Sequence, residues 1–188
     1  MTTRFLLMGL VLASSLQAQE MTKQPRWTLG AELGAASAVE NFVPGGDWKS
    51  GWSAGANLMY KVTSNLGIRG DANFAQNDLS GGAVPGEGRL NKLTYMGNLV
   101  LSGDVGPLGA ERLTAYGLAG LGAVTIHAKG SDSSFTTFGG DIGFGVGYRL
   151  GRLGLRAEGR DLMYKFDRFG YNKRQNDVVW EGGVTVGL

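Results

Sequence analysis

The feature that most constrains the fold is a strict two-residue alternation in the stretch DIGFGVGYRL, residues 141–150. Glycine stands at Gly143, Gly145 and Gly147, and bulky apolar residues occupy the positions between them. A period of two is typical of a β-strand whose side chains point alternately to two environments. Glycine weakens a strand because it has no side chain to pack. The pattern therefore indicates that one face of this strand lies where space is short.

Similar alternation recurs along the chain and predicts eight strands. The eight segments are residues 27–35, 52–62, 66–74, 93–101, 112–128, 138–150, 153–160 and 178–188. All four prolines fall outside these segments, as strand hydrogen bonding requires. Short connections alternate with long polar ones, which is typical of an up-and-down antiparallel meander. An even number of strands allows that meander to close into a barrel.

The fifth segment is the one whose faces are hardest to separate. Its stretch YGLAGLGAVTI is apolar or very small at nearly every position, so the two faces show little contrast. We assign Tyr116, Leu118, Val124 and Ile126 to the apolar face of the predicted barrel.

Two kinds of barrel fit eight alternating strands, and the polar face decides between them. A soluble lipocalin-like barrel would carry lysine, glutamate and threonine outside. Here the polar face consists of glycine, asparagine, serine and a few charges of both signs, which suits a narrow lumen. Small residues there would make room for long arginines and glutamates. The glycines concerned are Gly120, Gly122, Gly143, Gly145 and Gly147.

Aromatic residues of the apolar face stand near the ends of the segments and would form two girdles around an aliphatic band. We expect one girdle at the long-loop end, comprising Trp52, Phe74, Tyr95, Phe138 and Trp180. We expect the other at the short-turn end, comprising Trp27, Tyr60, Tyr116 and Tyr148. This arrangement is typical of the lipid-facing surface of a transmembrane barrel. The predicted fold is an all-β, closed, eight-stranded antiparallel up-and-down transmembrane β-barrel.

The N-terminus predicts export from the cytoplasm. Residues 1–18 contain Arg4, an apolar run and a polar end, as in a cleaved signal peptide, which leaves residues 19–188 as the barrel domain. The apolar run is too short for a membrane-spanning helix. The sequence has no cysteine, so no disulfide can stabilise the exported chain. A formal net charge of only +2 gives no support to nucleic-acid binding.

Three stretches resemble the small outer-membrane β-barrel family that includes the OmpA membrane domain and the OmpX and Ail proteins. They are LTAYGLAGLGAV, GGDIGFGVGYRL and LGLRAEGRDL. The resemblance implies an integral outer-membrane protein that is exported through the periplasm and inserted by the barrel-assembly machinery. It implies contact with outer-membrane lipid and lipopolysaccharide. Family members usually end in an aromatic residue, whereas this sequence ends in Leu188.

Charged residues on the lumen face predict a network of salt bridges. They are Glu32, Arg69, Asp71, Asp141, Arg149, Arg156, Glu158, Arg160 and Glu181. Buried charges must be paired, because an isolated one is very costly. Such a network would either plug the lumen or gate a small channel, and we favour the plug.

Catalysis and metal binding find little support in the residues. The family includes enzymes that modify lipid A with a histidine and a serine, but the only histidine, His127, lacks a serine two residues on. Serines of the following loop, Ser131, Ser133 and Ser134, are the remaining candidates for a nucleophile. The carboxylates Asp78 and Asp132 match no calcium-loop spacing. We therefore predict no enzyme activity, no metal and no cofactor.

The last long connection, residues 165–177, mixes basic and aromatic residues. Its candidate contact residues are Lys165, Arg168, Tyr171, Lys173 and Arg174. They could bind lipopolysaccharide phosphates or an extracellular ligand, or form an ordinary solvated loop. The function predicted is that of a monomeric structural or surface-interaction barrel. A small channel and a lipid A-modifying enzyme are the alternatives.

Overall fold

The computed structural model describes residues 26–38, 47–48, 50–80, 89–106, 113–128, 134–168 and 171–188. The predicted signal peptide, residues 1–18, lies outside these ranges. Within them, no helix is long and apolar enough to cross a membrane.

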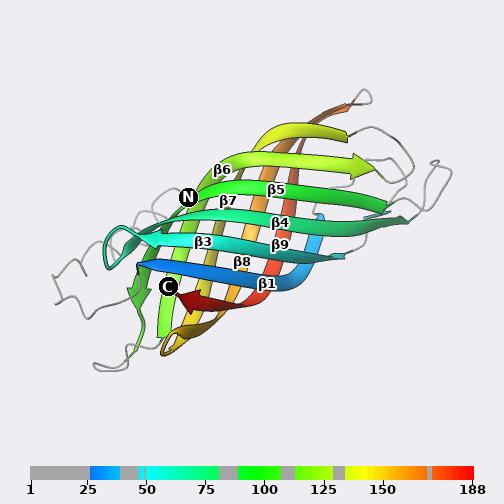
Figure 1. The fold of residues 1–188 in the computed structure, drawn as a ribbon. Coiled ribbons are helices and arrows are strands. Elements are labelled where there is room, and N and C mark those ends of the chain that lie inside the picture. Colours follow the sequence, from blue (N-terminus) through cyan, green and yellow to red (C-terminus); the bar gives the residue numbers. More distant parts are fainter. Residues whose placement is uncertain are drawn as a thin grey trace, which may run out of the picture.

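The described chain is a single sheet of antiparallel strands that closes on itself (Figure 1). The strands are β1 (Trp27–Ala38), β2 (Asp47–Trp48), β3 (Gly51–Lys61), β4 (Leu66–Ser80), β5 (Arg89–Asp104), β6 (Leu113–Ala128), β7 (Ser134–Leu150), β8 (Leu153–Arg168) and β9 (Tyr171–Gly187). Their order is β2-β4-β3-β1-β9-β8-β7-β6-β5, and pairing of β4 with β5 closes the ring. The two-residue β2 pairs with the far end of β4, beyond the part of β4 that pairs with β3. Because β2 continues the row of β3, the barrel has the eight strands that the sequence predicts.

The two ends of the barrel differ. At the short-turn end, β1 begins, β9 ends, and β7 turns into β8 through Gly151 and Arg152. Gly151 has a φ of 66°, a left-handed conformation that glycine adopts without strain. At the same end, the backbone amide of Leu188 donates to the carbonyl of Trp27 over 2.9 Å and joins the last strand to the first. The opposite end, where β4 meets β5 and β8 meets β9, is called the long-loop end.

On most of the barrel wall, apolar side chains point outward and polar ones inward. In β1, for example, Leu29 and Leu33 are exposed whereas Glu32 is buried. In every strand except β6, the side chains that point outward are those that the sequence predicts to do so. There, Leu118, Val124 and Ile126 are buried inside the barrel. The assignment of these residues and Tyr116 to the lipid face was wrong, because β6 has small or apolar residues on both faces and hence no contrast to read.

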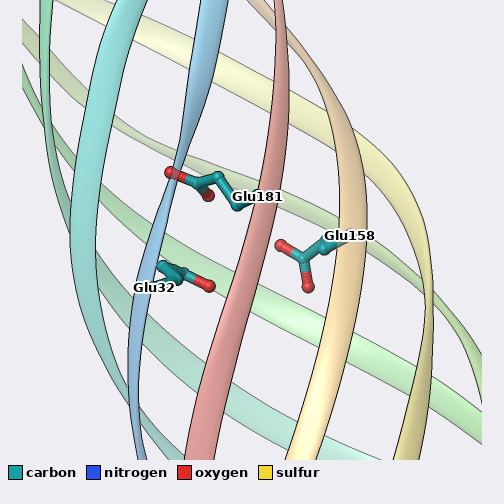
Figure 2. Close-up of side chains that lie close together, drawn as sticks. All are labelled: Glu32, Glu158 and Glu181. Atoms are coloured by element: carbon teal, nitrogen blue, oxygen red, sulfur yellow. The ribbon is translucent and has the colours of Figure 1, made fainter.

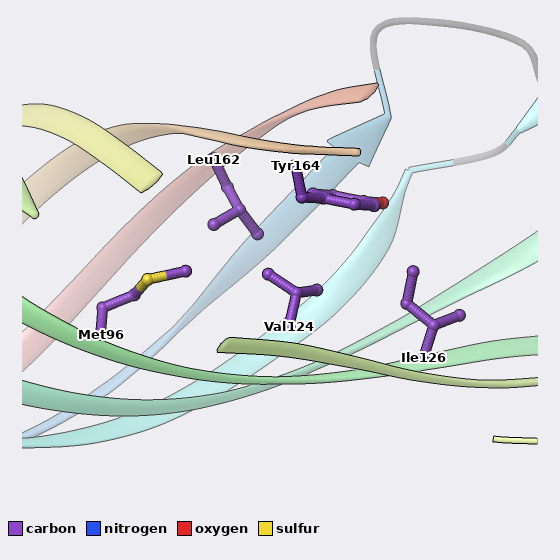
Figure 3. Close-up of a cluster of buried hydrophobic side chains, with 5 residues drawn as sticks. All are labelled: Met96, Val124, Ile126, Leu162 and Tyr164. Atoms are coloured by element: carbon purple, nitrogen blue, oxygen red, sulfur yellow. The ribbon is translucent and has the colours of Figure 1, made fainter. Parts of the chain in front are cut away.

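Towards the long-loop end the sense of the alternation reverses. On β8, Asp161 and Lys165 point outward, while the intervening Leu162 and Tyr164 are buried inside. On β6, the exposed His127 follows the buried Ile126. The inward residues Met96, Val124, Ile126, Leu162 and Tyr164 form an apolar cluster (Figure 3). Polar residues outside and an apolar core inside are what water around the barrel requires, so the strands continue beyond the apolar band of the wall.

Candidate functional site

Charged side chains gather inside the barrel, near the middle of its height. This charged belt consists of Glu32 from β1, Arg69 and Asp71 from β4, Asp141 from β7, Arg156, Glu158 and Arg160 from β8, and Glu181 from β9. The alternation of each strand brings these residues to the inner face, and closure of the sheet brings the strands to one another. Every member except Arg156 is buried, and the side chain of Arg156 is only 9% exposed.

Arg160 is the centre of the belt because it approaches all five carboxylates. Its Nη2 lies 2.6 Å from Glu181 Oε2 and 3.8 Å from Glu32 Oε1, and its Nε lies 3.1 Å from Glu158 Oε1. Its Nη1 lies 3.6 Å from Asp141 Oδ2 and 3.8 Å from Asp71 Oδ1. A planar guanidinium with donors in several directions is well suited to such a shared position.

The other two arginines link the remaining strands. Arg69 donates from Nη1 and Nη2 to the two oxygens of Glu158, over 2.6 and 2.8 Å, and from Nε to Asp71 over 2.9 Å. This two-pronged contact joins β4 to β8 across the lumen, and such geometry is among the strongest for an ion pair. Arg156 donates to Glu32 and, over 3.1 Å, to Asn57 Oδ1.

Neutral side chains complete the belt, and the sequence reasoning missed them. Tyr116 donates its hydroxyl to Glu158 Oε2 over 2.6 Å, so it points into the lumen and is not part of an outer girdle. Asn98 donates to Asp71 over 2.9 Å, and Asn73 donates to Glu181. Asparagines at inward positions of strands beside arginine and glutamate are the signal that could have identified these partners.

Three carboxylates of the belt lie close together. Glu32, Glu158 and Glu181 each offer an oxygen within 4.8 Å of the others, and Figure 2 shows them converging from β1, β8 and β9. Geometrically they could hold a cation. Arg160 already lies within 4 Å of all three, so a guanidinium supplies that positive charge. The belt has five carboxylates and three guanidinium groups.

One predicted member of the network lies apart. Arg149 lines a cavity at the short-turn end. It stands near the end of β7, eight positions along the strand from Asp141. The distance along the strand accounts for the separation.

A second buried layer lies on the long-loop side of the belt. Lys92 donates to Asp177, which also accepts the hydroxyl of Tyr164 over 3.0 Å. This polar group adjoins the apolar cluster of Figure 3 through Tyr164. Between the two layers, a cavity lined by Arg160, Asp177 and their neighbours has a volume of about 20 Å³. That is room for about one water molecule.

The glycines of β7 make room for different partners. A Cβ on Gly143 would lie 2.8 Å from Cγ of Arg160, as expected for a glycine that accommodates an arginine. A Cβ on Gly145 would lie 2.4 Å from the Tyr116 ring and hydroxyl, so this glycine accommodates a tyrosine instead. At Gly147 the nearest atom would be the Leu155 carbonyl oxygen, 3.7 Å away, and no close packing requires glycine there.

Comparison with known proteins shows which family has this architecture. A family model described as the outer membrane protein beta-barrel domain matches residues 6–188. The chain belongs to this family. It is therefore an integral protein of the outer membrane of Gram-negative bacteria. A comparison of the sequence with curated proteins found no match.

Solved structures of similar outer-membrane barrels agree with the fold. Neisserial surface protein A shares 17% identity, with a TM-score of 0.63 over 86% of this chain and 97% of that one. AlkL, determined in DMPC lipid bilayers, shares 15% identity, with a TM-score of 0.53 over 90% of this chain and 93% of that one. Ail, the attachment invasion locus protein of Yersinia pestis, shares 14% identity, with a TM-score of 0.50 over 87% and 98%. At these identities the likeness shows the fold alone.

On the outer surface of this membrane barrel, the predicted girdle residues other than Tyr116 occupy outward positions. Trp27 packs against Tyr60 with ring centroids 4.8 Å apart, and Trp52 against Phe74 at 5.3 Å. Trp180 meets Phe144 edge-on at 5.8 Å. Three more outward aromatics are exposed: Tyr95, Phe138 and Tyr148.

His127 lies on the outer face of β6, where it is exposed. Ser134 of β7 is its partner in the strand register, and no hydrogen bond between their side chains is seen among the described residues. The other predicted candidates of this loop, Ser131, Asp132 and Ser133, lie outside the described residues. Asp78 is exposed on the outer face of β4.

The connection predicted as a long loop over residues 165–177 is mostly strand. β8 continues to Arg168, β9 begins at Tyr171, and Lys165 is the register partner of Arg174. The loop prediction was wrong because the polar outward residues of this hairpin were taken as a sign of irregular structure. The side chains of Lys165 and Arg174 are exposed. Those of Arg168, Tyr171 and Lys173 lie outside the described residues.

Proposed function

We propose that this outer-membrane barrel is a non-enzymatic protein of structural or surface-interaction type, with a lumen closed to steady ion flow. The observation that carries the proposal is that two separate layers of side chains fill the interior of the barrel. The charged belt occupies one level of the lumen and the apolar cluster another, with a cavity of only about 20 Å³ between them. A conducting pore would need a continuous water path, and these layers oppose one.

The extension of the strands supports a role at the cell surface. We propose that the short-turn end faces the periplasm and that the long-loop end stands outside the cell. The part of the barrel beyond the apolar band then forms a rim with its own core of Met96, Val124, Ile126, Leu162 and Tyr164. A packed rim holds the connecting segments on a rigid base, which suits the binding of an extracellular ligand.

Basic residues of the β8–β9 hairpin favour an anionic partner. Lys165 and Arg174 are paired in register and exposed on the outer face, just beyond the apolar band. Two cations at this height would meet the phosphates of lipopolysaccharide, since charge-assisted hydrogen bonds form readily with phosphate oxygens. We propose that the hairpin contacts lipopolysaccharide, that the barrel-assembly machinery inserts the chain, and that the barrel works as a monomer.

Planar-bilayer recording tests the closed lumen. Purified, heat-modifiable protein should give little or no steady conductance in a lipid bilayer. Steady, unitary currents from the wild-type protein would instead favour the small-channel alternative.

Binding to extracted lipopolysaccharide tests the hairpin. We expect the double variant Lys165→Gln/Arg174→Gln, in nanodiscs, to bind more weakly than the wild type and with less dependence on salt. Arg26→Gln is the matched control, because Arg26 is an exposed cation at the opposite end of the barrel. Equal binding by the wild type and the double variant would contradict the contact.

The enzyme alternative has its own test. Mass spectrometry of lipid A should give the same species from cells that express the wild type, His127→Ala or no protein. A lipid A change that depends on His127 would overturn the non-enzymatic proposal.

A further inference from the structure

A half-enclosed cavity lies inside the barrel at the short-turn end, and we call it the vestibule. Its volume is about 150 Å³. Five basic residues line it: Lys61, Arg69, Arg149, Arg152 and Arg156. None of the described residues that line it is acidic. Two of these residues, Arg69 and Arg156, also belong to the charged belt, where they contact carboxylates. The other three, Lys61, Arg149 and Arg152, lie outside the belt.

The floor of the vestibule holds a donor that the belt does not use. The two terminal nitrogens of Arg156 donate hydrogen bonds to Glu32 and Asn57. Its Nε is buried and has no hydrogen-bond partner in the described part of the chain. A buried guanidinium donor without a partner is costly, and an acceptor within the cavity would satisfy it.

Hydroxyl groups add further donors around the wall. Thr28, Ser102 and Thr185 line the vestibule from β1, β5 and β9. Asp104, which ends β5 at the same end of the barrel, accepts a hydrogen bond from Thr114 over 3.1 Å and does not line the cavity. Cations and hydroxyls without a lining carboxylate make up the donor set that recognises an oxyanion.

We propose that the vestibule binds a small anion of the phosphate class. Its volume is at least about ten times the roughly 10–15 Å³ that one water molecule needs in the same measure, so a phosphate and a few waters fit. Clustered charges of one sign inside a low-dielectric wall concentrate counter-ions, and a dianion would complement the three lining cations that lie outside the belt, Lys61, Arg149 and Arg152. This role goes beyond the surface function proposed above, because it concerns the opposite end of the barrel.

Two sources could supply this chemistry, a free phosphate or the phosphate of a lipid headgroup. Isothermal titration of the full barrel in nanodiscs with inorganic phosphate tests the first. Titration with short-chain phosphatidic acid below its micelle concentration tests the second. Saturable binding of either probe supports the site and identifies its source. Absence of saturable binding of both would overturn the proposal.

Variants locate the bound anion. Arg152→Gln alters an exposed turn residue, and Lys61→Gln alters a half-buried residue at the end of β3. Each should weaken binding on the order of tenfold, as expected for loss of one hydrogen bond to a charged group. Arg26→Gln, which alters an exposed cation at the same end of the barrel that does not line the vestibule, should leave the affinity unchanged. Equal affinity in all three variants would place any binding elsewhere and overturn the proposal.

Backbone NMR of the wild type gives a readout that does not depend on the folding of a variant. Titration with the probe that binds should shift the amide signals of Thr28, Ser102 and Thr185 in parallel. The amide of Thr136, near the long-loop end of β7, should not move. Shifts confined to the long-loop end would contradict the site.

Discussion

Glu158 of β8 and Glu181 of β9 stand directly opposite each other in the strand register, inside the barrel. Like charges in that relation destabilise a sheet. Here Arg160 contacts both, with Nε 3.1 Å from Glu158 Oε1 and Nη2 2.6 Å from Glu181 Oε2. Arg69 adds two further hydrogen bonds to Glu158. Arginine side chains thus make the two facing carboxylates of neighbouring strands compatible.

Replacement of Arg160 should therefore be the most damaging change in the belt. Arg160→Met removes the cation shared by five carboxylates but keeps an unbranched side chain of moderate length. We expect a loss of about 3–5 kcal/mol in the free energy of unfolding, as for other broken buried pairs. Urea titration in lipid vesicles measures it.

A double-mutant cycle provides the control for that change. Glu181→Gln keeps the shape of the side chain and removes one of the opposed charges, so it should cost less than Arg160→Met. Combined with Arg160→Met, it should restore part of the loss, since contacting residues are not additive. Additive effects of the two changes would show that the pair does not interact.

Tyr116→Phe tests the inward orientation of this side chain. The hydroxyl donates to a buried carboxylate, Glu158, so its removal should cost about 1.5–3 kcal/mol. Tyr148→Phe is the control, because Tyr148 is exposed on the outer face of β7 and should change stability by less than about 0.5 kcal/mol. The same small effect for both variants in urea titrations would return Tyr116 to the lipid face.

Two glycines of β7 should respond oppositely to alanine. At Gly145 the added methyl group would lie 2.4 Å from Tyr116 and 2.7 Å from the Ala157 carbonyl oxygen. Overpacking against backbone cannot relax easily, so Gly145→Ala should destabilise the barrel by about 1–3 kcal/mol. Gly147→Ala meets only ordinary contacts and should be neutral or stabilising by up to about 1 kcal/mol. Thermal shifts of the heat-modifiable gel band compare the two variants, and indistinguishable shifts would argue against close packing at Gly145.

Leu162→Ala tests the core of the rim. Leu162 is 7% exposed inside the apolar cluster, so truncation should leave a cavity and cost about 2–5 kcal/mol. Met163→Ala changes the next residue of β8, which points outward, and should reduce the free energy of unfolding by much less. Unfolding titrations in vesicles distinguish the two, and equal costs would mean that the rim has no packed interior.

Much of the fold could be predicted because lipid and lumen impose opposite polarity on successive residues. β1 shows this in the contrast between Leu33, which is exposed to the outside, and Glu32, which is buried. The same reasoning failed on β6, where Leu121 faces out and Leu118 faces in. Side chains of equal polarity carry no information about direction, so only the register with β5 and β7 orients that strand.

The belt was predictable in its charges but not in its neutral members or its neighbouring layer. Arg160 and Glu181 stood out as charges on otherwise apolar strands. Lys92 and Asp177 did not, because they lie beyond the predicted strands, in segments that read as polar loops. Near these segments the environment outside the wall changes from lipid to water, and on β8 the alternation reverses within a single strand. A search that assumes apolar residues outside and polar residues inside therefore ends each strand at that boundary.

The seam between β1 and β9 has a consequence for the kinetics of folding. It pairs Thr28 with Gly187, from opposite ends of the described chain. Because this pairing has the longest loop to close, we expect it to form last. Until then the sheet has two edges with unpaired amides and carbonyls, each costing several kcal/mol if exposed to lipid. Partial barrels are thus penalised within the bilayer, and the last pairing to form is also the one with the longest loop to close. Insertion should proceed as one slow, cooperative event without a populated intermediate of fewer strands.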